Sequence, residues 1–138
     1  MAAMSNYLKQ QLRAHIFRTA TFAKPAHLWI GLFTSSPTDA GTGTEVSGGA
    51  YARVQRDPSD ANWTAASPTN GETDNAAAVT FPAPVGADWG VIGWIGIFDA
   101  GPTGGNLLIW GELAIHKTVN DGDAAPSFGV DALQIIFD

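Results

Sequence analysis

The segment at residues 89–99 (WGVIGWIGIFD) constrains the fold more than any other, because it concentrates large apolar and β-branched residues between turn signals. It lacks the apolar–polar alternation of a half-exposed strand, so we predict a strand that protein covers on both faces. Alternation along this strand predicts two faces, formed by Val91, Ile95 and Ile97 on one side and by Ile92, Trp94 and Phe98 on the other. We expect Trp94 to be buried.

A turn-rich segment at residues 99–105 (DAGPTGG) leads from this strand into a second apolar run at residues 106–113 (NLLIWGEL). Two such runs joined by a short Gly-containing loop predict an antiparallel hairpin. Glycines at positions 90, 93 and 96 weaken a strand, so they indicate close backbone approach, a bulge or a sharp bend. Since the hairpin core contains no polar catalytic group, we interpret it as a structural scaffold.

Further short strands are predicted between Gly, Pro, Asn and Asp turns, at residues 27–34, 50–56, 76–82, 112–119 and 132–137. The fold class that these strands indicate is mainly β: an antiparallel, jelly-roll-like β-sandwich with one N-terminal amphipathic helix. A doubly wound α/β fold is excluded, because it requires several helices between its strands. We expect a single domain over residues 1–138, in which residues 1–24 form the helix and a linker and residues 25–138 form the sandwich.

The predicted helix covers residues 5–18. Ser5 or Asn6 is a suitable N-cap, and Leu8, Leu12 and Ile16 recur at the spacing of one helix face. Two interpretations remain open: a packed apolar stripe beneath a solvated polar face, or a helix that docks onto a partner. In the second case the docking residues are Leu8, Lys9, Leu12, Arg13, Ile16 and Arg18.

Charge is distributed unevenly along the chain. Residues 1–38 carry four basic and no acidic side chains, whereas residues 39–138 carry three basic and thirteen acidic ones. The acidic body would repel phosphate, so we expect no nucleic-acid partner. Docking of the basic end onto an acidic surface, such as a neighbouring copy, accounts better for the asymmetry. No apolar run reaches the length of a membrane span and no secretory signal is recognisable, so we expect no membrane association and synthesis in a cytoplasm.

Residue patterns typical of catalysis or metal binding are missing. The chain has no cysteine, and His15, His27 and His116 are widely separated. No G-x-S-x-G motif and no phosphate-binding loop occur. The carboxylates that remain as candidates mostly occupy turn positions, where they cap the backbone: Asp57, Asp60, Glu72, Asp74, Asp88, Asp99 and Glu112. We therefore expect no enzymatic activity, no metal site and no cofactor.

Two long polar tracts, residues 38–49 and 57–75, have no periodicity and are predicted to be surface loops. Trp63 is isolated within the second tract. Such a tryptophan either attaches its loop to the core or stacks on a ligand. Tyr51 and Trp63 are accordingly the candidate ligand-stacking residues if the chain is a glycan-binding module.

Six sequence motifs occur in an order typical of one family: MSNYL (residues 4–8), LWIGLFTSSPTDAGTG (28–43), GGAYARV (48–54), VTFP (79–82), WGVIGWIGIFDA (89–100) and GGNLLIWGEL (104–113). In these motifs the chain resembles small virion proteins of tailed bacteriophages that are commonly labelled tail fiber proteins. The resemblance spans nearly the whole sequence. It implies a non-enzymatic structural protein located in the virion, with other virion proteins as partners, and it carries over no active-site residue.

Only 14% of the residues are charged, which suits a subunit that buries its sides against neighbours. We therefore expect a homo-oligomer, with a trimer favoured. Three functions remain open: a tail-associated fiber, spike or baseplate subunit; a capsid decoration protein; and a host-glycan-binding module.

Overall fold

The computed structural model describes residues 2–137. In chain order its elements are β1 (Ala3–Met4), α1 (Asn6–Phe17), β2 (Trp29–Phe33), β3 (Val54–Gln55), β4 (Thr73–Asp74), β5 (Val79–Thr80), β6 (Gly90–Phe98), β7 (Leu107–Val119), β8 (Ser127–Phe128) and β9 (Gln134–Ile135). Every pairing between named strands is antiparallel. The predicted mainly β class with one N-terminal helix is therefore confirmed.

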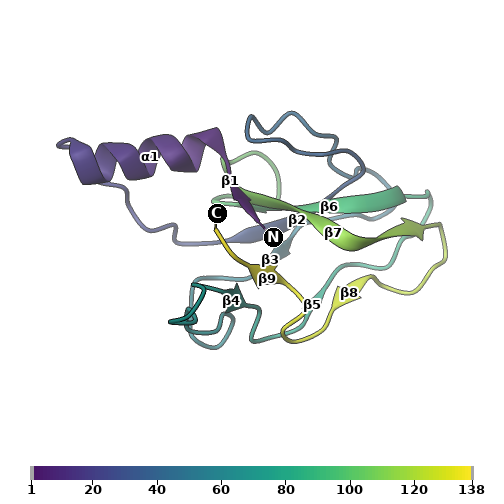
Figure 1. The fold of residues 1–138 in the computed structure, drawn as a ribbon. Coiled ribbons are helices and arrows are strands. Elements are labelled where there is room, and N and C mark those ends of the chain that lie inside the picture. The colour runs from purple at the N-terminus through teal and green to yellow at the C-terminus, as the bar shows by residue number, and fades with distance from the viewer. Residues whose placement is uncertain (1, 138) are drawn as a thin grey trace.

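The predicted hairpin forms the centre of the main sheet, whose strand order is β1-β7-β6-β2-β3. Beneath this sheet lie two short ribbons, β4 with β9 and β5 with β8, as Figure 1 shows. The core between these layers contains Ile30, Leu32, Val46, Val79, Phe81, Trp89, Ile92, Ile97, Val119 and Leu133. The arrangement is sandwich-like, with ribbons and loops as its second layer.

One register shift changes the two faces that were predicted for β6. A bulge between Ile92 and Trp94 rotates the strand, so that Ile92 joins the core face with Ile97. Val91 is consequently 51% exposed, and the prediction that it shares a face with Ile97 is wrong. Trp94 is only partly buried, contrary to expectation, and its ring centroid lies 5.0 Å from that of His116.

Several predicted strands are shorter in the structure because turn residues interrupt them. The segment at residues 50–56 pairs only at Val54–Gln55, since Gly49 and Ala50 both adopt positive φ angles. Conversely, β1 was not predicted, because two residues give no periodicity. It forms one edge of the main sheet and places the start of α1 beside β7.

Candidate functional site

The N-terminal end of α1 is attached firmly to the main sheet. Ser5 is the N-cap: its side-chain oxygen accepts a hydrogen bond from the Leu8 amide at 3.1 Å and donates to the Leu107 carbonyl. The Ser5 amide donates to the Leu108 carbonyl at 2.8 Å. Leu8 is 7% exposed, so the first turn of the helix belongs to the core.

A charged contact secures the same end to the loop at residues 35–49. The Lys9 ammonium pairs with the carboxylate of Asp39, which also accepts a hydrogen bond from the Trp110 indole at 2.9 Å. These two donors lower the pKa of Asp39. Of the six candidate docking residues, Leu8 and Lys9 are thus used within the chain itself.

The C-terminal half of α1 projects away from the sheet (Figure 1). Ile16 is 67% exposed and Phe17 is 80% exposed, and we call this pair the tip. Arg13 and Arg18 are exposed, whereas Leu12 is half-buried. Two adjacent large apolar side chains at the end of a projecting helix are typical of a contact site.

The segment that follows the helix folds back against it and makes the projection an ordered unit. The Phe22 amide donates to Nδ1 of His15 at 3.2 Å, and the Arg18 amide donates to the Ala14 carbonyl. We call residues 13–24 the arm. It carries the exposed bases Arg13, Arg18 and Lys24 and no acidic residue.

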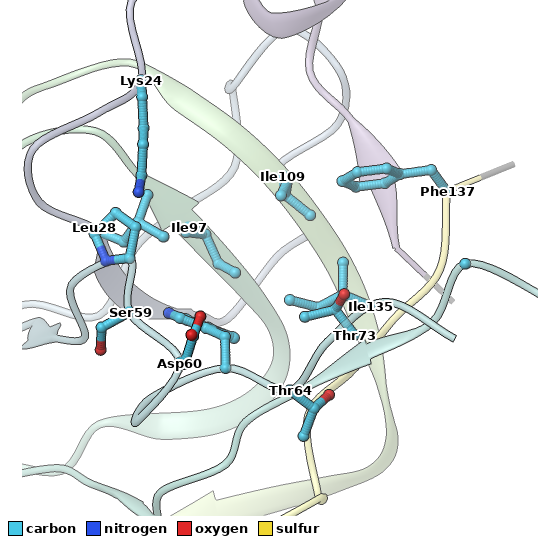
Figure 2. Close-up of a pocket in the computed structure, with 13 residues that line it drawn as sticks. Lys24, Leu28, Ser59, Asp60, Thr64, Thr73, Ile97, Ile109, Ile135 and Phe137 are labelled. Carbon is cyan, nitrogen blue, oxygen red and sulfur yellow. The ribbon is translucent and has the colours of Figure 1, made fainter. Parts of the chain in front are cut away.

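A cavity of about 600 Å³, which we call the socket, opens between the main sheet and the ribbon of β4 and β9. Figure 2 shows Ile97, Ile109 and Ile135 at its floor, contributed by β6, β7 and β9. Its remaining lining is Lys24, Leu28, Pro58, Ser59, Asp60, Trp63, Thr64, Gly71, Thr73 and Phe137. The segment that forms one wall, residues 57–75, consists of a loop followed by β4, and it contains four acidic residues and neither Lys nor Arg.

A family model described as "Podophage GP4 fiber I protein gp80" matches residues 3–136. The chain belongs to this podophage fiber family. No curated protein matches it. The resemblance to tail fiber proteins is thereby confirmed, and membership of a fiber family identifies a structural component of the phage particle.

In this fiber-family chain the two candidate stacking residues lie in different surroundings. The Tyr51 hydroxyl accepts from the Leu32 amide at 2.9 Å and donates to Glu45 at 2.8 Å, and its ring packs against Phe81 and Trp89. Burial, followed by the neighbouring Glu45 carboxylate, raises the pKa of Tyr51. Tyr51 does not line the socket, so a stacking role at that cavity is left to Trp63.

Trp63 attaches its loop to the body and lines the socket at the same time. Its indole donates to the Arg56 carbonyl at 3.2 Å, and its ring packs against the main core. These contacts agree with the attachment of the loop to the core, and the stacking role of Trp63 stays a prediction.

Sequence reasoning missed the role of Arg53, a buried side chain with several partners in this chain. Its guanidinium makes two 2.7 Å hydrogen bonds to the Glu45 carboxylate, bonds to the carbonyls of Ala100 and Gly104, and lies 3.5 Å from the centroid of the Phe98 ring. Alternation had indicated a half-exposed strand. The sequence does offer one indication of this ion pair, because Glu45 is the one acid in residues 40–56.

Across residues 2–137 no three His, Asp or Glu side chains gather in a way that could hold a metal ion. Among the same residues, no helix combines the length and the apolar character needed to cross a bilayer.

Proposed function

We propose that this chain is a tail-associated structural subunit of the podophage particle, and that the arm attaches it to a neighbouring subunit. The observation that carries the proposal is the division of α1 into two halves. Its first turn is fixed to the sheet by Ser5 and Leu8, whereas its tip, Ile16 and Phe17, is left in solvent on an ordered support. Exposing two large apolar side chains is unfavourable unless a partner covers them.

The family favours a tail location over the alternative of a capsid decoration protein, since the matching model describes a fiber protein. Both roles would use the basic arm to bind an acidic surface. They differ in position and copy number: a decoration protein accompanies heads in hundreds of copies, and a fiber subunit accompanies tails in far fewer.

The test is incorporation into particles. Phage lacking its own copy of the protein is supplied in trans with the wild-type chain, with a tip variant that combines Ile16→Asp and Phe17→Asp, or with Ile115→Asp. Ile115 lies on β7 and is 81% exposed, so the last variant is a matched control for a new surface charge. Separated heads and tails are then quantified by electrophoresis.

We expect the wild-type and Ile115→Asp chains with the tails, and the tip variant reduced there by at least about tenfold, as for loss of an interface hot spot. Normal incorporation of the tip variant would exclude the arm as the attachment element. Recovery of the wild-type chain with the heads would favour the decoration role.

A further inference from the structure

We infer that the arm of one copy inserts its tip into the socket of a second copy, so that the protein assembles head to tail with itself. This inference specifies the neighbour in the proposed function and rests on the proposed use of the arm. Three features of the chain support it: the tip and the floor of the socket are both apolar, the arm is basic whereas the segment at residues 57–75 is acidic, and the tip is exposed.

The apolar surfaces correspond in character and in size. The tip consists of Ile16 and Phe17, and the floor of the socket consists of three isoleucines with Trp63 in the wall. A cavity of about 600 Å³ has room for an aromatic and a branched side chain together. An aromatic ring beside Trp63 would gain contact beyond simple burial.

Charge favours the socket of a second copy over a second arm. Every arm carries Arg13, Arg18 and Lys24 without an acid, so two arms packed together would repel each other. The loop at residues 57–75 carries Asp57, Asp60, Glu72 and Asp74, and Asp60 lines the socket. Lys24 of the same copy also lines the socket, and in Figure 2 its side chain points toward the side of Ser59 and Asp60.

The geometry makes the contact heterologous, since the tip and the socket are different surfaces of the chain. Contacts of this type close into rings when the rotation between copies permits it. The sequence-based expectation of a homo-oligomer is compatible with such a ring.

The experiment measures the mass of the purified full-length protein by sedimentation and light scattering. Two variants each remove one half of the contact. Phe17→Asp places a charge at the tip, and Ser59→Trp combined with Asp60→Arg fills the mouth of the socket and reverses its charge. Phe17, Ser59 and Asp60 are all exposed, so neither variant disturbs the core, and circular dichroism confirms the fold of each.

We expect the wild-type chain and the control Ile115→Asp to form oligomers, and each of the two variants alone to be monomeric. An equimolar mixture of the two variants should form a one-to-one dimer, because the Phe17→Asp chain keeps an intact socket and the socket variant keeps an intact tip. Association of the wild-type chain should weaken at high salt. A monomeric wild-type chain, a variant that still assembles, or a mixture that stays monomeric would each overturn the inference. A socket that binds a free saccharide in a monomeric wild-type chain would overturn it as well.

Cross-linking supplies an independent readout, because the natural chain contains no cysteine. Mixing a Phe17→Cys chain with a Ser59→Cys chain under oxidising conditions should give a disulfide-linked dimer, and replacing Phe17→Cys by Ile115→Cys should not. Equal yields from both mixtures would contradict the assignment. If the protein does not assemble in solution but its incorporation into particles still depends on the tip, this inference is refuted and the proposed attachment role is not. If the protein assembles in solution through the tip but the tip variant is incorporated into particles normally, the proposed attachment role is refuted and this inference is not.

Discussion

Replacing Arg53 by methionine removes the side chain that joins three parts of the fold. Its guanidinium binds the Glu45 carboxylate twice at 2.7 Å and the carbonyls of Ala100 and Gly104 at 3.1 and 2.7 Å. Methionine is an unbranched apolar side chain that supplies neither a donor nor a positive charge over the Phe98 ring. The change therefore leaves a carboxylate and two carbonyls without their partner.

The expected cost follows from the burial of the two charges. Breaking a buried ion pair by removing one partner costs about 3–5 kcal/mol. Only 6% of the Arg53 side chain is exposed, but 25% of the Glu45 side chain is, so water can partly hydrate the carboxylate that remains. We therefore expect Arg53→Met to lower the free energy of unfolding by about 3 kcal/mol, the lower end of that range.

The assay is equilibrium urea unfolding followed by tryptophan fluorescence at a fixed protein concentration. Arg56→Met is the matched control, because Arg56 donates only to the main-chain carbonyls of Gln55 and Ala78. We expect the control to cost about 1 kcal/mol. A double-mutant cycle with Glu45→Gln should give a coupling energy of at least about 1 kcal/mol. Equal costs for the two arginine variants would refute the reasoning.

Three further predictions concern single residues. Tyr51→Phe should reduce stability at neutral pH, because it removes the hydrogen bonds of the hydroxyl to Leu32 and Glu45. It should also abolish a progressive loss of stability of the wild-type chain above about pH 10, since the pKa of Tyr51 is raised in the fold and ionisation above the unfolded value then favours the unfolded state; urea titrations at several pH values check this. Asp39→Asn should flatten the loss of stability below about pH 4, since the lowered pKa of Asp39 stabilises the fold above the unfolded value and the effect fades in acid. Gly49→Ala should cost about 1–3 kcal/mol more than Gly48→Ala in thermal unfolding: both glycines have positive φ, but only at Gly49 would the new Cβ lie 2.4 Å from the Ala87 carbonyl oxygen.

Local patterns were sufficient for those features whose cause is local. The apolar runs at residues 89–99 and 106–113 predicted the central hairpin, and Ser5 with the spacing of Leu8 and Leu12 predicted the helix and its cap. Composition, periodicity and capping depend on residues that are adjacent in the chain, so they require no knowledge of distant contacts.

The missed features depend on contacts between distant segments. The sequence indicated a close approach, a bulge or a bend at Gly90, Gly93 or Gly96 without choosing among them. In the structure the bulge lies at Gly93, where a Cβ would lie 2.8 Å from Cε1 of His116 on the neighbouring strand. The burial of Arg53 depends on Glu45, which a surface loop brings to it. The socket is lined by segments spread from residue 24 to residue 137, so no single motif encodes it.

The packed-stripe interpretation of the N-terminal helix fits only its first half, and the docking interpretation stays a prediction for its second half. Its stripe begins as core at Leu8, is half-buried at Leu12 and is exposed at Ile16, because the helix leaves the sheet as it proceeds. A helix whose only role was to cover the sheet would gain nothing from apolar residues beyond Leu12, and Phe17 extends the exposed surface further. Since the Lys9–Asp39 pair and the Ser5 cap fix the direction of the helix, the tip is held at a defined position relative to the body. Pre-organisation of this kind lowers the entropic cost of binding, which is the property expected of an attachment element in a particle assembled from repeated subunits.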